Sequence, residues 1–483
     1  MTIGARPAER VDVCIIGAGP AGNAMAIRMA QLGRDVCMIE RSVFPRSHIG
    51  ELLSPGIWPQ LDLLGVAGTV ASAGFWPCRT SVAEWESGVP VRRDFGTSGG
   101  LLVDRAAFDA LLLNCARTHG VRVMQPAVVR TRTRRDQGWH LEVQCADRIC
   151  ALDVDFLADA SGRSAVLRGR KKRAYHRTLA LYGYWRGARL PDEPRIEAGL
   201  DAWYWGLPLP DGTYNAMVFL DADDFRGRRA PSLSATYHAL IARSGLMTGC
   251  RDVRLFGPVR AADATPYLDS NSIGPRSIKI GEAALALDPL SSSGVQKAIN
   301  TALAGAASVN TLLRYPEQAD AAKRFYTGNL GEASDRHRRW AARHYAVAAA
   351  TRPARFWQTR AADAAAEPER ISPANGFGLP HHLAVALSPD AMLMPEPCIV
   401  GDFIATKPAL HHPDLERPVA FLGGCEVAEL LQPLHPGMAL GALMNAWKVP
   451  NGSKPAIAEW LIKHRVLRLH QNEGIMHKED RNE

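Results

Sequence analysis

Hydrophobic residues form two short runs near the N-terminus, at residues 11–16 and 36–39. The segment between them, residues 23–31, has helical character, so the pattern predicts a strand, a turn, a helix and a second strand. Glycines in the turn follow the spacing G-x-G-x-x-G, and an acid ends the second run. The residues concerned are Gly17, Ala18, Gly19, Pro20, Ala21, Gly22 and Glu40.

This arrangement is typical of a dinucleotide-binding site. The first glycine permits a tight turn, the second lets the backbone approach a pyrophosphate, and the third lets the helix pack against the strand. Free N–H groups at the helix start would face the phosphates. Glu40 could hydrogen-bond a ribose hydroxyl, and the adjacent Arg41 could reach the adenosine phosphates. The surrounding strands and helix make a plain glycine-rich surface loop the poorer interpretation.

Two later segments repeat the change from an apolar run to a polar turn. Residues 156–166 read FLADASGRSAV, and the segment from residue 278 leads through GEAALALDPLSSSGV to an Ala-rich helix that begins at Gly294 or Val295. Between them, residues 179–256 are rich in strand-like sequence, and an alternating stretch at residues 75–98 predicts an excursion into the same second sheet.

The remainder of the chain changes character twice. Two helices are predicted at residues 318–329 and 331–350. Residues 361–413 are rich in Pro, Ala and His with little periodicity, which indicates a linker or a wrapped arm. From residue 418, three short amphipathic segments and a basic tail predict either a small separate domain or a helical cap.

Composition narrows the class of protein. Hydrophobic residues make up 47% and charged residues 22% of the 483 positions, as in a globular protein with a large core. Nine scattered cysteines without a C-x-x-C pair argue against a disulfide framework and against a zinc site. There is no apolar run of membrane-spanning length and no signal-peptide pattern, so we predict no membrane span and a cytoplasmic location.

The chain is basic, with a formal net charge of +8 and a sequence pI of about 9.1. Arginine clusters, such as RTRTRR at residues 130–135, are interleaved with acids, and no nucleic-acid-binding motif is present. A solvated basic surface is the simpler interpretation, and an acidic partner protein is the best functional one. We predict no nucleic-acid partner.

The three loops at residues 17–22, 159–164 and 281–295, taken together, resemble the FAD-dependent monooxygenase and halogenase superfamily over roughly residues 11–330. The resemblance implies the para-hydroxybenzoate hydroxylase fold, an α/β fold with a Rossmann-like FAD-binding domain interleaved with a β-rich substrate domain, here followed by a small mainly helical C-terminal domain. We expect the FAD-binding domain at residues 1–75, 100–165 and 275–330, the substrate domain at 76–99 and 166–274, a helical extension at 331–365, a linker or arm at 366–417, and the C-terminal domain at 418–483.

The resemblance also implies which residues hold FAD. In this family the third loop reads G-D, and its acid holds the ribityl chain, whereas this chain has Gly281 and the longer Glu282. The segment beside the flavin ring ends at a helix N-terminus, whose N–H groups can stabilise negative charge on the reduced flavin. No second G-x-G-x-x-G is present, so NAD(P)H would bind transiently or a separate reductase would supply the electrons. The further implied FAD contacts are Ile49, Gly50, Arg105, Asp288, Ser293, Gly294 and Val295.

Two motifs are similar to the halogenase-like branch of this superfamily. Residues 44–53, FPRSHIGELL, match that branch's F-P-R-x-H-I-G-E-S, and Trp203, Trp205 and Pro208 match its W-x-W-x-I-P. The resemblance implies that the two tryptophans wall the tunnel between flavin and substrate. Core packing is the alternative for both of them.

One departure from the halogenases bears on the reaction. Halogenases carry a lysine shortly after the segment that reads F-P-R-x-H-I-G-E-S. At the corresponding place this chain has Cys78 and Arg79, which we assign to the substrate pocket. Arginine stays protonated and is a poor substitute for a lysine that donates a proton. Halogenation is therefore disfavoured, and we expect hydroxylation of an aromatic ring by O₂ through a flavin C4a-hydroperoxide. The catalytic acid or base is not identified, although His48 and Glu51 lie in the same loop neighbourhood.

One sub-branch of halogenase-like flavoproteins hydroxylates a tryptophan of a partner protein during tryptophylquinone biogenesis, as for quinohemoprotein amine dehydrogenase. The basic surface and the C-terminal region would suit such a protein or peptide substrate, and by analogy the C-terminal helices have the spacing of a winged-helix-like peptide-recognition module. Two alternatives stay open. One is a halogenase of a pyrrole, phenol or indole, and the other is a non-catalytic flavoprotein that assists assembly of a partner.

Overall fold

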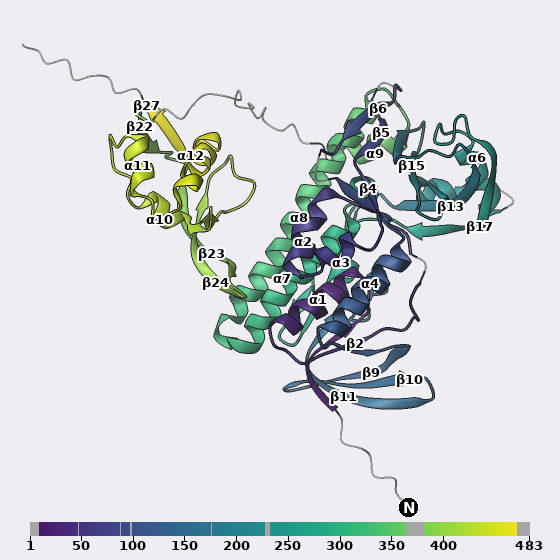
Figure 1. Ribbon diagram of the computed structural model, residues 1–483, viewed down its shortest axis with the longest axis horizontal. Coiled ribbons are helices and arrows are strands. Elements are labelled where there is room, and N and C mark those ends of the chain that lie inside the picture. Colours follow the sequence, from purple (N-terminus) through teal and green to yellow (C-terminus); the bar gives the residue numbers. More distant parts are fainter. Residues whose placement is uncertain are drawn as a thin grey trace, which may run out of the picture. The chain divides into compact units, whose positions relative to one another are not determined.

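The protein is seen here in a computed structural model that describes residues 9–46, 48–86, 88–96, 99–174, 176–227, 232–362, 364 and 381–470. The chain divides into two compact units, residues 1–366 and residues 367–483. Figure 1 labels elements of both units.

A mixed sheet of eight strands forms the base of the first unit. Its central strands β20, β11, β1, β2 and β8 run parallel, so the loops after β1, β2, β11 and β20 leave from one edge. Helices α1, α4 and α7 pack together beside it (Figure 1). Ligands of open α/β sheets bind at this carboxyl edge. The bounds are β1 Glu9–Ile16, α1 Pro20–Gln31, β2 Val36–Ile39, α4 Arg105–Thr118, β8 Arg122–Met124, β9 Ala127–Arg135, β10 Gly138–Cys145, β11 Arg148–Asp159, β19 Ile273–Gly274, β20 Ser277–Lys279 and α7 Gly294–Arg314.

A second, mainly antiparallel sheet has seven strands in the order β17-β13-β16-β15-β14-β5-β6. One face packs on α6 around Trp185 and Tyr237, and the other belongs to a core that contains Trp203 and Trp357. The early strands β5 and β6 join strands that lie more than one hundred positions later in the sequence. The bounds are β5 Thr80–Glu84, β6 Val91–Asp94, β13 Thr178–Ala188, β14 Arg195–Ala198, β15 Trp203–Pro208, β16 Tyr214–Asp221, α5 Ala222–Gly227, α6 Leu233–Ile241 and β17 Arg251–Asp263.

Short elements connect the two sheets. One three-stranded sheet contains β3, β7 and β4, and another contains β12, β18 and β21. The bounds are β3 Leu52–Leu53, α2 Trp58–Leu63, α3 Ala67–Ala71, β4 Trp76–Cys78, β7 Gly100–Leu102, β12 Lys171–Arg173, β18 Tyr267–Asp269 and β21 Leu285–Ala286.

The helical extension differs from the sequence-based expectation. Instead of two helices, the single helix α8, Ala319–Ala349, runs through Gly328 and Gly331 and is followed by α9, Arg355–Ala361. A glycine inside a helix costs about 1 kcal/mol relative to alanine, which packing can offset. Here α8 packs on both α7 and α9, so the glycines do not interrupt it.

The second unit contains more β structure than predicted. Part of the expected linker forms the hairpin of β23 and β24, and β22 pairs with β27 around a core that includes Leu410 and Trp447. Pro395 and Pro397 obscure the strand pattern, yet proline is tolerated in an edge strand. Parts of the expected helical extension, linker and C-terminal domain lie outside the residues that the structure describes, namely residues 365–380 and 471–483. The bounds are β22 Ala384–Leu387, β23 Met392–Val400, β24 Phe403–His411, β25 Phe421–Leu422, β26 Cys425–Glu426, α10 Val427–Leu431, α11 Leu440–Ala446, α12 Lys454–Lys463 and β27 Leu467–His470.

The expected α/β fold class is confirmed. Within the described residues, no helix combines the length and apolar character that crossing a membrane requires.

Candidate active site

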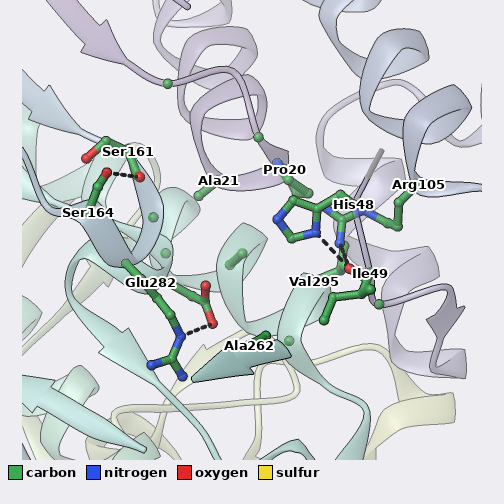
Figure 2. A pocket seen from close by; sticks show the side chains of 18 of the residues that line it. Pro20, Ala21, His48, Ile49, Arg105, Ser161, Ser164, Ala262, Glu282 and Val295 are labelled. Atoms are coloured by element: carbon green, nitrogen blue, oxygen red, sulfur yellow. Dashed lines mark hydrogen bonds and ion pairs between the residues drawn. The ribbon is translucent and has the colours of Figure 1, made fainter. Parts of the chain in front are cut away.

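A cavity of about 750 Å³ lies between the carboxyl edge of the parallel sheet and one face of the seven-stranded sheet. Its volume falls within the roughly 300–1,000 Å³ that is usual for ligand pockets. Figure 2 shows Pro20, Ala21, Glu282 and Val295 around it, with Ala262 from the edge of the second sheet. Loops distant in sequence therefore meet at one space.

The turn between β1 and α1 requires glycine at two positions. Gly17 has φ +105°, and a Cβ there would lie 2.6 Å from the carbonyl oxygen of Ala160. A Cβ on Gly22 would lie 1.9 Å from the carbonyl oxygen of Gly17. The turn therefore brings α1 close to β1, and Gly19 and Pro20 at the helix start line the cavity.

Glu40 joins the ends of β1 and β2. Its carboxylate is 5% exposed and accepts hydrogen bonds from the backbone N–H groups of Ala18 and Ser42, each at 2.8 Å. These bonds hold the carboxylate at the cavity wall beside Arg41, which also lines the cavity. A carboxylate oxygen has a second lone pair, so a ligand hydroxyl could donate to it as well.

The loop before β3 is held by Arg105 at the start of α4. Arg105 makes two hydrogen bonds to Asp109, at 2.9 and 3.0 Å, and donates at 3.0 Å to the carbonyl of Ile49 (Figure 2). Arg46 also reaches the cavity, with Nη2 3.9 Å from Asp109. Among the described residues, the buried Nε of Arg46 has no hydrogen-bond partner. This cationic loop is suited to an anionic ligand.

The carboxylate of Asp159 stabilises the DASGRS loop, to which it belongs. Asp159 accepts hydrogen bonds from the Ser161 hydroxyl at 2.5 Å and from the Leu167 N–H at 2.7 Å, so it shapes the loop. Arg163 of the same loop forms an ion pair with Glu282, with Nε 3.7 Å from Oε1. The second and third motifs therefore meet through this ion pair.

The third loop leads into α7 and is supported from α8. Tyr345 of α8 donates to the carboxylate of Asp288, at 3.1 Å from either oxygen, and the N–H of Leu290 donates to the same carboxylate at 3.0 Å. Lys297, in the first turns of α7, is buried and donates to the carbonyl of Leu285 at 2.5 Å. Burial lowers the pKa of Lys297 to about 8. A buried cation therefore lies at the α7 end of the cavity.

The opposite wall is apolar and aromatic. Trp203 is 1% exposed and stacks on Phe219 with ring centroids 3.8 Å apart, whereas Trp205 is only partly buried. Both tryptophans line the cavity, so Trp203 also has the core-packing role that was the alternative. The other sheet residues on this wall are Ala180, Tyr182, Leu207, Met217, Ala262, Asp263 and Ala264.

Most of the expected FAD contacts lie at this cavity. Three of the expected contacts lie outside the lining. Gly22 packs behind the turn, the N–H of Ala18 donates to Glu40, and the Ser293 hydroxyl lies 2.6 Å from that of Ser291. The expected residues on the lining are Gly17, Gly19, Pro20, Ala21, Glu40, Arg41, Ile49, Gly50, Arg105, Glu282, Asp288, Gly294 and Val295.

The residues expected in the substrate pocket lie in more than one place. Trp203 and Trp205 line the cavity, but Cys78, Arg79 and Pro208 are absent from its lining among the described residues. Cys78 ends β4 and is 3% exposed in the core beside Leu102, and its thiol donates to the carbonyl of Thr80. Cys78 thus belongs to the core cluster that also contains the lining residues Trp203 and Met217.

Two basic residues of the cavity, Arg46 and Lys297, had no role assigned from the sequence. Arg46 belongs to the quoted FPRSHIGELL motif but had no assigned role, and Lys297 follows the quoted SSSGV segment by two residues. A lysine close to a predicted helix N-terminus is an unfavourable placement for a cation. This unfavourable placement of a positive charge is the sequence feature that could have indicated a role for Lys297.

The residues of the cavity fit FAD. Gly17 and Gly22 allow the tight turn that brings the start of α1 to the cavity, and α7 also starts there. The partnerless Nε of Arg46 is suited to a phosphate oxygen. Glu40 and the α1 turn would hold the adenosine half, and Glu282 and the start of α7 would hold the flavin half.

Comparison with known proteins agrees with this geometry. A family described as FAD dependent oxidoreductase matches residues 12–169. Tryptophan 2-halogenase from Chondromyces crocatus is 29% identical over 343 residues, which cover 65% of this chain and 64% of that protein. The match thus spans slightly less than two thirds of this relative's length.

Two solved structures match nearly the whole chain. The flavin-dependent halogenase CmlS has a TM-score of 0.77 at 22% identity, covering 96% of this chain and 97% of that one. The peptidyl tryptophan dihydroxylase QhpG, described as essential for tryptophylquinone cofactor biogenesis, has a TM-score of 0.67 at 26% identity, covering 94% and 99%. The C-terminal unit therefore does not separate halogenases from hydroxylases. Residues 12–169 therefore match a family of FAD-dependent oxidoreductases, and the chain has the fold of the flavin-dependent halogenases and monooxygenases.

Proposed function

We propose that this protein is an FAD-dependent monooxygenase that hydroxylates the ring of a tryptophan in a partner protein, as a step in tryptophylquinone biogenesis. The observation that carries the proposal is the apolar, aromatic wall that faces the FAD-binding loops across one cavity. The similarity to a peptidyl tryptophan dihydroxylase over 94% of the chain supports it.

The wall suits an indole. Tyr182, Trp205 and Met217 offer flat or apolar surface, on which an aromatic ring gains both burial and ring–ring contact, the latter about 0.5–1.5 kcal/mol. The basic character of the chain, with a net charge of +8, favours an acidic peptide around the tryptophan.

The position of the cavity's lysine supports oxygen transfer over halogenation. Residues 78 and 79 contribute no lysine, and their side chains lie outside the cavity lining. Lys297 is the lysine of the lining among the described residues, and it lies on the α7 wall, where it is bonded to a backbone carbonyl. The sheet wall that would hold the substrate ring carries no lysine within the described residues.

In the proposed reaction, bound FAD, once reduced, supplies the chemistry of oxygen activation. The chain's own part is to exclude water, to place the ring and to accept protons. Trp205 and Tyr182 would orient the ring, and the N-terminus of α7 with Lys297 would stabilise negative charge. We propose NAD(P)H, bound transiently, or a separate reductase as the electron source.

Halogenation is the second candidate, because the related sequences include a tryptophan 2-halogenase. It shares the indole-sized wall and the cofactor, so the placement of the lysine is the structural feature that favours one reaction over the other. They differ in the atom transferred, and that difference can be measured directly.

The test supplies the FAD-loaded enzyme with a flavin reductase, NADH, ¹⁸O₂ and chloride or bromide. The substrates are free tryptophan, an acidic peptide containing one tryptophan, and the same peptide with phenylalanine in its place. The proposal expects ¹⁸O at tryptophan of the peptide, independent of halide, by tandem mass spectrometry. Halide incorporation without ¹⁸O would establish the second candidate, and no product from either tryptophan substrate would refute both.

A further inference from the structure

Glu51 lies between two cavities. It lines the main cavity and also a second cavity of about 300 Å³, and His48 is the other residue that both cavities share. The second cavity is lined on its far side by Tyr184, Arg260 and Asp104, among others. The Glu51 side chain is therefore a partition between a largely apolar space and a more polar one.

The Glu51 carboxyl group joins the loop before β3 to the seven-stranded sheet. Tyr184 of β13 donates its hydroxyl to Oε1 at 3.0 Å, and Asn215 of β16 donates its amide to the same atom at 3.1 Å. The N–H of Gly50 donates to Oε2 at 2.8 Å. With 2% of its surface exposed, the group is held by neutral donors from three separate segments.

The charged groups around Glu51 are already engaged or lie across a cavity. Arg105, the nearest cation, is committed to Asp109 and to the carbonyl of Ile49. His48, Asp104 and Arg260 face the second cavity. Burial raises the pKa of Glu51 above its ordinary value, since desolvation disfavours the charged form.

Asn215 gives the carboxyl group a way to exist in both protonation states. Among the described residues, its Oδ1 is buried without a hydrogen-bond partner. As arranged, the amide N–H₂ donates to a carboxylate. A half-turn of the amide would present Oδ1 instead, which could accept from a protonated Glu51. Either state is therefore satisfied by a rotation of one side chain.

We propose that Glu51 is the proton-accepting residue of this site and that it passes the proton on toward the second cavity. The proposal rests on the proposed function. After oxygen transfer to the ring, the C–H bond at the new C–O carbon breaks, its electron pair returns to the ring, and the proton goes to the Glu51 carboxylate. The proton then leaves past Tyr184 and His48, and the carboxylate is restored for the next turnover.

The first test needs no substrate. Infrared difference spectra of the FAD-loaded enzyme, recorded across a pH titration, should show the carbonyl band of a buried protonated carboxyl group, shifted in D₂O and absent in Glu51→Gln. The matched control is Glu197→Gln. Glu197 is a partly buried glutamate, whose pKa burial raises to about 7, and it lies outside the lining of both cavities. If Glu51→Gln loses no titrating band that Glu197→Gln keeps, the assignment is overturned.

The second test uses turnover. A positioned proton acceptor contributes about 10²–10⁴-fold, so Glu51→Gln should lower kcat by that factor with little change in KM. Wild-type kcat should rise with pH through the pKa of Glu51, and the variant should lack that limb. Tryptophan deuterated on the ring should show an isotope effect in the variant that wild type lacks, and Glu51→Asp should recover part of the rate. Unchanged kcat and pH profile in Glu51→Gln would overturn the proposal.

The two proposals fail in different ways. If no tryptophan substrate is oxidised by wild type, the proposed function fails while the infrared titration still reports on Glu51. If wild type hydroxylates tryptophan and Glu51→Gln does so equally well, the function stands and the role of Glu51 is refuted.

Discussion

The two ends of the cavity differ in whether backbone groups or side chains form them. The cofactor end is formed mainly by the backbone. It consists of glycine turns, helix N-termini, and carbonyl groups that accept hydrogen bonds from Arg105 and Lys297. At the sheet end, side chains from strands β13, β15 and β16 form the wall, which includes the stacked rings of Trp203 and Phe219.

This difference determines how each end tolerates change. A backbone site depends on conformations that few residues can adopt, so its critical positions are small and local in sequence. A side-chain wall depends on packing between distant strands, so it can change its specificity while the fold is kept. Four comparisons of variants test this distinction, beginning with the largest expected effect.

The two tryptophans of the wall should separate into a core residue and a cavity residue. Trp203→Ala removes a fully buried ring stacked at 3.8 Å and should cost about 3–5 kcal/mol of unfolding free energy. Trp205→Ala, at a partly buried ring, should cost roughly 1–2 kcal/mol and mainly weaken peptide binding. Urea unfolding and peptide titration measure both. Equal losses of stability would make Trp205 a core residue too.

The two buried lysines of the first unit should respond in opposite directions. Lys279 is paired with buried Asp269 at 2.9 Å, and Lys279→Met should destabilise the protein by about 3–5 kcal/mol. Lys297→Met should instead stabilise the apoprotein at pH 7, by up to about 3 kcal/mol. Addition of FAD should reduce that advantage if Lys297 faces negative charge.

The difference in stability between wild type and Lys297→Met should change with pH in a definite direction. Native Lys297 loses its proton near pH 8, whereas the unfolded lysine does so near 10.5, so the native state binds fewer protons between these values. Wild-type stability from this group should therefore rise with pH across that window, and the advantage of Lys297→Met should fall. Urea midpoints at pH 7 and pH 10 measure it, and a constant difference would contradict it.

At the cofactor end, Gly22→Ala should weaken FAD binding more than tenfold. Its Cβ would lie 1.9 Å from the Gly17 carbonyl oxygen, and such overpacking costs about 1–3 kcal/mol or more. Gly68→Ala, where a Cβ meets nothing within 4 Å, is the control and should leave the affinity unchanged. Flavin fluorescence gives the Kd. Equal affinities for the two variants would show that the α1 turn does not contact the cofactor.

Glu40→Gln should have the smallest effect. The amide oxygen can accept from one of the two N–H groups that bind Glu40, which leaves the other unsatisfied at about 1 kcal/mol. FAD should bind about five times more weakly. Glu142→Gln on β10, where the carboxylate binds Thr131 at the surface, is the matched control. A loss above a hundredfold would mean that the carboxylate charge itself holds the ribose.

The fold class and most of the cofactor end could be predicted from sequence, because the motif that carries them is local. Gly17, Gly22 and Glu40 lie within 24 positions, and the strand–turn–helix spacing constrains where they go. The sheet end could be predicted only in part. Trp203 and Trp205 were found through a motif, whereas where Cys78 lies relative to the cavity depends on the pairing of β4 with β7, which no local pattern records.

The sequence by itself determined the parallel α/β base, the glycine turn, and the absence of lysine at positions 78 and 79. Only the tertiary structure decided that Glu51, Tyr184 and Asn215 meet, since they come from a loop and two strands that lie up to 164 positions apart. It also decided that Lys297 is buried and that Trp203 is core. Periodicity records which face of an element is apolar, whereas the contacts between faces depend on packing over the whole unit.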